Sequence, residues 1–154
     1  MTAPDARRML VELPFRVSTY DVDFVGIVHN AVYIRWLEDL RNKLLDEYFP
    51  LKAALERGIA PVLSRTEIDY RWPVRMFDRV VGRMWVPETK RAQWVVAAEI
   101  VTEDSIAATA RQTGYFVEIE GKRPIPLPEE LKGGCRRSGA GVRQVVHQRA
   151  RSAL

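Results

Sequence analysis

The sequence predicts an α+β fold in which one long amphipathic helix packs on an antiparallel β-sheet. Three observations lead to this fold class. The first third of the chain holds a single long stretch with helical periodicity, and the second half holds four stretches rich in Val, Ile, Trp, Tyr and Thr. The connections between those four stretches are short, which favours antiparallel pairing of neighbouring strands.

The chain begins with a segment that has no clear periodicity, and we expect residues 1–10 to form a flexible leader. The next segment, Leu13–Thr19, alternates apolar and polar residues, as a half-buried strand does. Residues 20–28 follow as a turn or a short irregular segment.

The helix is predicted from apolar residues that recur three or four positions apart: Val32, Tyr33, Trp36, Leu37, Leu40, Leu44, Leu45 and Tyr48. It should begin near Asn30, which is a competent N-cap, and end near Pro50. Residues 52–58 are predicted to add one or two helical turns that end at Gly58.

The remaining elements are predicted from β-branched and aromatic residues separated by turn residues. The predicted strands are Ala60–Tyr70, Arg79–Val86, Gln93–Thr102 and Ala107–Ile119. Gly114, inside the last of these, predicts a bend or bulge. Residues 122–128 are rich in proline and should be extended, and Glu129–Lys132 should form a last helical turn.

Length and charge define the domain limits. The chain has 154 residues, of which 47% are hydrophobic, so one domain spanning residues 11–132 is expected. Residues 133–154 carry five arginines and no acid, so the net charge of +4 belongs to this tail and the body is close to neutral. A basic tail of this kind is expected to be disordered, although Val142, Val145 and Val146 also permit a short amphipathic helix. The location of the charge argues against a nucleic-acid-binding domain.

Several classes of protein are excluded by what the sequence lacks. No apolar run reaches the roughly 18 residues of a membrane span, and no apolar segment of signal-peptide length follows the N-terminus. The single cysteine, Cys135, fits a reducing, cytoplasmic setting. The two histidines and this cysteine lack metal-ligand spacing, and no Gly-rich phosphate loop is present, so we expect no metal and no cofactor.

The strongest functional signal lies between Ser18 and Glu38. This segment places Asp23 a few residues before the start of the predicted helix. A carboxylate can attack a carbonyl or activate water, and the free N–H groups of a helix start can hold a developing negative charge. These are the parts that acyl transfer requires. A carboxylate that only stabilises a turn is the alternative.

The segment also resembles a known family. From Tyr20 to Glu38 it reads Tyr-Asp-x-Asp-x-x-Gly-x-Val-x-Asn-x-x-Tyr-x-x-Trp-Leu-Glu. This pattern is similar to the signature of hotdog-fold acyl-CoA thioesterases of the 4-hydroxybenzoyl-CoA thioesterase type, and the likeness extends less strongly from Leu13 to Leu131. The resemblance implies a curved sheet wrapped around the helix and hydrolysis of an acyl-CoA thioester.

The resemblance also implies roles for individual residues. Asp23 takes the position of the nucleophile or general base, and the backbone N–H of Asn30 that of the group polarising the thioester carbonyl. Gly26 allows close approach of the backbone to the substrate, and Tyr33 contacts the substrate. His29 either orients water or the acyl group, or simply packs at the helix entry.

Two further sets of charged residues bear on the predicted site. Arg75 matches a basic residue in the family's second recognisable block, and with Arg71 and Arg79 it either meets CoA phosphates or remains an exposed loop charge. Asp21 is interpreted as a solvated or turn-stabilising acid. If its segment were extended, Asp21 and Asp23 would share one face.

The family also dimerises with its site at the subunit boundary, so the resemblance implies a homodimer or a dimer of dimers, that is, a homotetramer. Three alternatives stay open: a thioesterase for acyl groups on an acyl-carrier protein, a non-catalytic acyl-CoA-binding module, and a hydratase. The hydratase is disfavoured because five residues, not four, separate Asp23 from His29. No nucleic-acid or membrane partner is expected.

Overall fold

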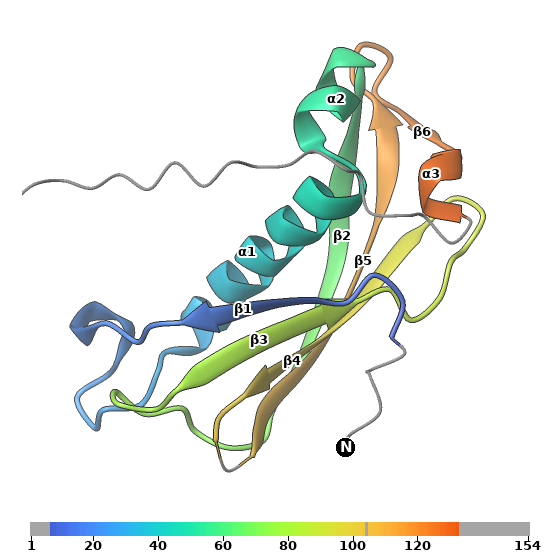
Figure 1. The fold of residues 1–154 in the computed structure, drawn as a ribbon. Coiled ribbons are helices and arrows are strands. Elements are labelled where there is room, and N and C mark those ends of the chain that lie inside the picture. Colours follow the sequence, from blue (N-terminus) through green and yellow to red (C-terminus); the bar gives the residue numbers. More distant parts are fainter. Residues whose placement is uncertain (1–6, 104, 133–154) are drawn as a thin grey trace, which may run out of the picture.

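The computed structural model describes residues 7–103 and 105–132. A curved antiparallel sheet of six strands packs against one long helix, α1 (Figure 1). The strand order is β1-β3-β4-β5-β2, and β6 also pairs with β5. The strands are β1 Val11–Phe15, β2 Ile59–Tyr70, β3 Val80–Trp85, β4 Trp94–Val101, β5 Ile106–Glu118 and β6 Arg123–Ile125. The helices are α1 Asn30–Tyr48, α2 Leu51–Glu56 and α3 Glu129–Lys132. The predicted α+β architecture is therefore confirmed.

Helix α1 buries the apolar stripe predicted for it. Its buried residues are Val32, Tyr33, Trp36, Leu37, Leu40, Leu44 and Tyr48. They pack mainly on β1 and β3, where the Phe15 ring stacks on Trp36 with 5.1 Å between ring centroids. The helix begins at Asn30 as predicted, but the N-cap position is occupied by His29 rather than Asn30.

The first strand differs from its predicted limits. β1 ends at Phe15 instead of continuing to Thr19. The reason is local: the backbone N–H of Ser18 donates to the Asp21 carboxylate at 2.9 Å, which closes the short 3-10 helix Thr19–Asp21. Alternation of apolar and polar residues does not reveal such a closure.

The bulge predicted at Gly114 lies on the neighbouring strand instead. The pairing of β2 with β5 shifts register between Leu63 and Arg65, so Ser64 is the extra residue, and Leu63 is paired with Gly114. A Cβ on Gly114 would collide with the Val62 carbonyl oxygen and the Trp94 ring. Glycine is therefore required here by close packing.

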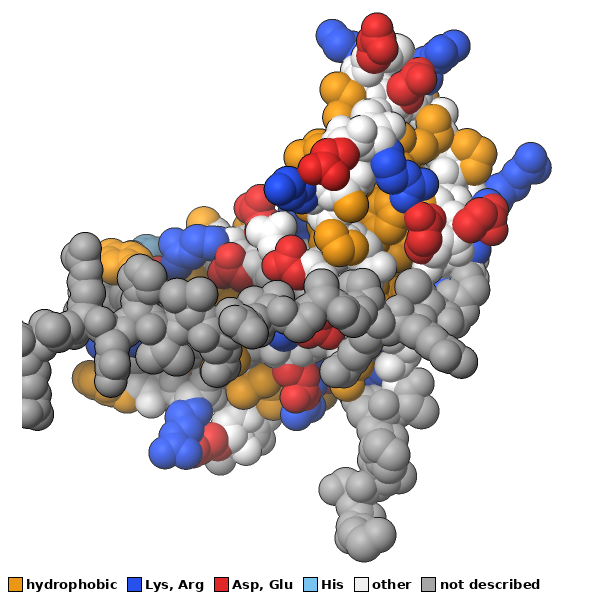
Figure 2. Space-filling model, turned by 45° about the horizontal axis from the view of Figure 1, so that its top comes forward, with side chains coloured by type: hydrophobic (Ala, Val, Ile, Leu, Met, Phe, Trp, Pro, Cys, Tyr) orange, Lys and Arg blue, Asp and Glu red, His pale blue; other side chains and the backbone are white. Residues whose placement is uncertain are grey.

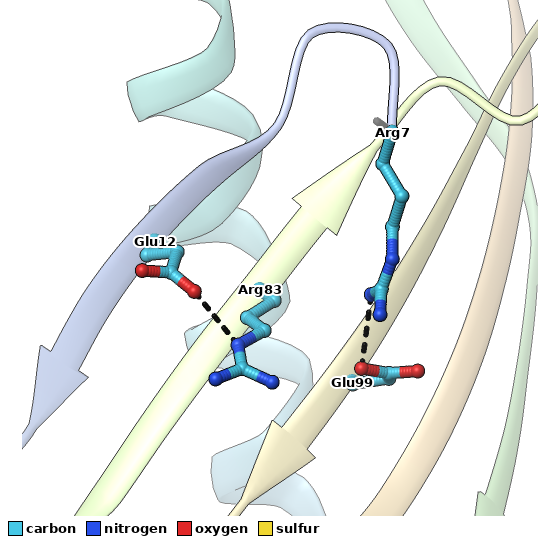
Figure 3. A network of polar contacts seen from close by, with 4 residues as sticks. All are labelled: Arg7, Glu12, Arg83 and Glu99. Atoms are coloured by element: carbon cyan, nitrogen blue, oxygen red, sulfur yellow. Dashed lines mark hydrogen bonds and ion pairs between the residues drawn. The ribbon is translucent and has the colours of Figure 1, made fainter. Parts of the chain in front are cut away.

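A row of alternating charges covers the outer face of the sheet. Glu12, Arg83 and Glu99 are successive partners across β1, β3 and β4. Arg83 pairs with Glu12 at 2.7 Å, and Arg7 pairs with Glu99 at 3.0 Å (Figure 3). The Arg7 guanidinium also lies over the Trp85 ring, 4.1 Å from its centroid. Opposite charges thus face each other across neighbouring strands on the side of the sheet away from α1.

The face of the molecule seen in Figure 2 has acidic, basic and hydrophobic side chains interspersed among its coloured residues. Within the described residues, no helix is long and apolar enough to cross a membrane. The predictions for the tail, including Cys135, concern residues outside the described part of the chain.

Candidate active site

The candidate site is built on a tight loop that leads directly into α1. Val22 and Val28 form an antiparallel bridge, and the Asp23 N–H donates to the Ile27 carbonyl at 2.9 Å. On its other side, Ile27 bridges to Arg75. The structure therefore brings five of the predicted site residues together on two adjoining loops and the helix start: Asp23, Gly26, His29, Asn30 and Arg75.

Asp23 is held through one of its two carboxylate oxygens. Its Oδ1 accepts hydrogen bonds from the N–H groups of Val25, at 2.9 Å, and Ile27, at 3.1 Å. Among the described residues, Oδ2 has no hydrogen-bond donor. The side chain is half-buried. The carboxylate therefore stabilises its own loop and still presents one oxygen to a substrate or a water molecule.

Gly26 is required by backbone conformation. Its φ of +77° lies in the left-handed region, which side chains with a Cβ rarely adopt. A Cβ at this position would meet no atom within 4 Å. The glycine therefore shapes the turn after Asp23. That Gly26 lets the backbone come close to the substrate stays a prediction.

The first turn of α1 presents backbone donors beside this loop. The Val32 N–H is taken by the His29 carbonyl at 3.0 Å, whereas the N–H groups of Asn30 and Ala31 have no acceptor within the described part of the chain. α1 is 19 residues long, so its dipole adds positive potential at these donors. The His29 side chain is exposed and makes no capping hydrogen bond.

Asp21 stabilises its turn, as one of the two interpretations expected, and it is also buried and paired with Arg35. It is only 2% exposed, and its carboxylate accepts from Arg35 Nη2 at 2.6 Å as well as from Ser18. Its carbonyl oxygen accepts from the His29 N–H at 2.9 Å. Asp21 thus ties the turn that precedes Asp23 to two positions of α1.

The environment of Asp21 favours its ionised form. Burial opposes the charge, but hydrogen bonds from the Ser18 N–H and Arg35, together with the charge of Arg35, outweigh it and lower the pKa of Asp21. Of the two interpretations of Asp21, the turn-stabilising acid is confirmed and the solvated acid is wrong. The segment Thr19–Asp21 is a 3-10 helix and not extended, so the condition for a face shared by Asp21 and Asp23 is not met. The capping-box spacing of Ser18 and Asp21 is a sequence signal for the role of Asp21 in its turn. The sequence holds no corresponding signal for its pairing with Arg35.

Tyr33 lies beneath the surface of the site. It is 3% exposed and packs edge-on against Tyr70, with 5.0 Å between ring centroids. Burial raises the pKa of the Tyr33 phenol, although a backbone hydrogen bond with Val74 acts in the opposite direction. Tyr70 is half-exposed, and its hydroxyl donates to the Asn30 carbonyl at 3.3 Å. The ring accessible to a ligand is therefore that of Tyr70.

The basic residues of the second block differ in their partners. Arg75 is exposed, and its backbone N–H donates to the Asp78 carboxylate at 2.8 Å. Arg79 pairs with Glu103 at 3.4 Å, and Arg71 is exposed. Among the described residues, Arg75 and Arg71 make no ion pair, so their guanidinium groups are available to an anionic ligand.

Large hydrophobic side chains stand exposed around the two loops. Phe24 is 100% exposed, Phe77 93% and Trp72 63%. Exposed apolar groups that gather beside a site are typical of a surface that contacts another molecule. In the described residues, no three His, Cys, Asp or Glu side chains lie close enough to hold a metal ion.

Comparison with known proteins identifies the family of the chain. The family model of the thioesterase-like superfamily matches residues 17–134. A putative esterase of Aquifex aeolicus is 27% identical over 117 residues, which cover 75% of this chain and 90% of the relative. The acyl-CoA thioester hydrolase YbgC of Escherichia coli is 24% identical over 124 residues, covering 79% and 92%.

A solved structure extends the likeness to the fold. A thioesterase of Thermus thermophilus, crystallised with coenzyme A and zinc, superposes with a TM-score of 0.69 and 25% identity. The alignment covers 81% of this chain and 90% of that one. The region that the family model matches includes the Asp23 loop, α1 and strands β2 to β6, and on these grounds the chain belongs to the thioesterase-like superfamily and has the hotdog fold.

Proposed function

We propose that the protein hydrolyses acyl-CoA thioesters to the free acid and coenzyme A. The observation that carries the proposal is the arrangement of Asp23. Its carboxylate is fixed through Oδ1, its Oδ2 is open, and its loop leads into a helix start whose first N–H groups have no acceptor among the described residues. The names of the relatives, an acyl-CoA thioester hydrolase among them, support the same chemistry.

The reaction follows from these groups. Asp23 either attacks the thioester carbonyl carbon or removes a proton from a water molecule that attacks it. The resulting oxyanion accepts hydrogen bonds from the N–H groups of Asn30 and Ala31, and one such donor contributes about 3 kcal/mol in the transition state. The C–S bond then breaks and the CoA thiolate leaves. If Asp23 is the nucleophile, water hydrolyses the acyl-enzyme anhydride in a second step.

Other residues support binding in this proposal. Arg75 meets a phosphate of coenzyme A, because its exposed guanidinium suits phosphate oxygens. The Tyr70 ring lines the site beside the helix start, and the buried Tyr33 ring packs against Tyr70 and fixes its position. His29, exposed at the N-cap, orients the attacking water.

We also propose that the site is completed in a homodimer or a dimer of dimers. Two observations support this. β2 is the last strand in the sheet order, so in the described chain one of its edges has no partner strand. Phe24, Trp72 and Phe77 are exposed around the site, and a second subunit would cover them.

The test is release of thiol from a panel of acyl-CoA substrates by the wild-type protein and Asp23→Asn. The panel holds benzoyl-CoA, butanoyl-CoA and decanoyl-CoA. We expect wild-type hydrolysis and a loss of about 10²-fold or more in the variant, the range of a lost acid–base group. Asp46→Asn, an exposed carboxylate on α1, is the control and should keep full activity.

Three outcomes would contradict this proposal. Equal activity of wild type and Asp23→Asn would remove Asp23 from the chemistry. Wild-type inactivity towards every CoA thioester, with activity on the same acyl groups attached to an acyl-carrier protein, would move the function to the carrier-protein alternative. Binding of acyl-CoA without any hydrolysis would identify a non-catalytic module.

A further inference from the structure

A cavity lies at the opposite end of α1 from Asp23. It has a volume of about 230 Å³ and lies between the C-terminal half of α1, the sheet and α3. Its walls are mostly apolar and include Leu44, Leu45, Trp94, Val96, Phe116 and Leu131. A cavity of roughly 150 Å³ with apolar walls already accepts benzene. This cavity therefore has room for a larger apolar group.

Polar residues line one side of the cavity. Arg41 is one of them, and its Nη1 donates to Gln112 Oε1 at 2.6 Å, while Gln112 Nε2 donates to the Thr66 hydroxyl at 3.0 Å. Gln112 is only 1% exposed, so this chain of hydrogen bonds connects α1 to β5 and β2 within the protein. Glu38 and Asn42 also line the cavity, and both are exposed. The cavity therefore opens to the surface beside α1.

The entrance and the Asp23 site lie along one side of the same helix. Ala31, Ile34 and Glu38 are three or four residues apart, so they share a side of α1, and all three are exposed. Glu38 is eight residues beyond Asn30, which is about 12 Å along the axis. An extended chain advances about 1.2 Å per bond, so about ten bonds span this distance.

We infer that this cavity receives the distal end of an aliphatic acyl chain of about twelve carbons or more, whose thioester is held at Asp23. The apolar walls exclude the charged CoA part of the substrate. An aromatic ring attached directly to the thioester carbonyl ends far short of the entrance. The inference rests on the proposed thioesterase function, because it takes the position of the carbonyl from that reaction.

The test is a chain-length profile of kcat/KM with a variant that blocks the entrance. Asn42→Trp places a large ring at the rim from an exposed helix position. Asp46→Trp, one turn further along α1, is equally exposed and does not line the cavity, so it is the matched control. We expect wild type to prefer tetradecanoyl-CoA, whose acyl chain extends about 16 Å, over butanoyl-CoA and benzoyl-CoA. Asn42→Trp should lower the tetradecanoyl-to-butanoyl ratio of kcat/KM at least tenfold, and Asp46→Trp should leave it unchanged.

A binding measurement separates this inference from the reaction itself. Tetradecanoyl-CoA and butanoyl-CoA are titrated calorimetrically into Asp23→Asn and into Asp23→Asn with Asn42→Trp. Tighter binding of tetradecanoyl-CoA that is lost with Asn42→Trp supports the cavity assignment even if no thioester is hydrolysed. Equal affinity for both ligands, or an equal effect of both tryptophan substitutions, overturns the assignment whatever the activity.

Discussion

Asp21 and Asp23 show how two carboxylates separated by one residue take different parts. Asp21 is buried and joins the Asp23 turn to α1 through Arg35 and the His29 N–H. Asp23 remains on the open loop. We therefore regard Asp21 as a positioning residue: it acts on the chemistry through the placement of Asp23 and the helix start.

Removal of this buried charge should make stability depend on pH in a defined way. We expect Asp21→Asn to lower the free energy of unfolding by about 1–3 kcal/mol at pH 7. The folded-state pKa of Asp21 is lowered from its ordinary value of 3.8, so its stabilisation is fully present above that value and is lost as pH falls through the folded-state pKa. The difference between wild type and variant should therefore narrow below about pH 4. Urea unfolding at pH 7 and pH 3 measures it.

Arg35→Lys is the companion variant, because it keeps the positive charge beside Asp21 and loses the guanidinium geometry. If the free energy of unfolding of wild type exceeds that of Asp21→Asn by the same amount at pH 7 and pH 3, the ion pair does not contribute to stability as described.

At this scale the sequence predicts what is local. Asp23, Gly26 and Asn30 lie within eight residues of one motif, and the structure places them on one loop and the helix start, whereas their roles in the reaction stay predictions. The partner of Asp21 was not predictable, because Arg35 is fourteen residues away on a helix face that looks solvent-exposed in the pattern. Tyr70 was missed for a similar reason: its contact with Asn30 spans forty residues.

At the scale of elements, two glycines have different requirements. Gly26 needs a positive φ and has open space around it, so Gly26→Ala should cost about 1 kcal/mol of stability through backbone strain. Gly114 lies where backbone and an indole ring leave no room for a Cβ, so Gly114→Ala should cost about 2–3 kcal/mol. Both variants replace glycine by alanine, so thermal or urea unfolding compares the loss of stability that the same added methyl group causes at the two positions. A smaller loss for Gly114→Ala than for Gly26→Ala would contradict the packing described here.

The long elements were predictable because each carries its own periodicity. The α1 pattern repeats over nineteen residues, and the four later strands begin and end within one residue of their predicted limits. The end of β1 and the bulge in β2 were not predictable in the same way. Both depend on a partner, the Asp21 carboxylate in one case and the paired strand β5 in the other.

At the scale of the whole molecule, the open edge of β2 predicts how two copies meet. We expect the wild-type protein to be a dimer or a tetramer in solution, as measured by light scattering. Val62 is exposed on β2, and Val62→Lys should weaken association by about tenfold or more, because it introduces like charges at a two-fold contact. Pro14→Lys, on the opposite edge strand β1, is the control. Weakening by Pro14→Lys alone would mean that the molecule associates through β1.

The bulge in β2 also bears on how such a chain tolerates changes in length. Ser64 has no register partner on β5, although its hydroxyl donates to the Thr113 carbonyl at 3.0 Å, while Leu63 and Arg65 are matched to the adjacent residues Gly114 and Thr113. Loss of this one residue would leave both halves of β2 in their present alternation, with Leu63 and Thr66 still directed towards α1. We therefore expect single-residue deletion at Ser64 to be tolerated. A deletion elsewhere in β2 would move the side chains of one half of the strand to the opposite face of the sheet.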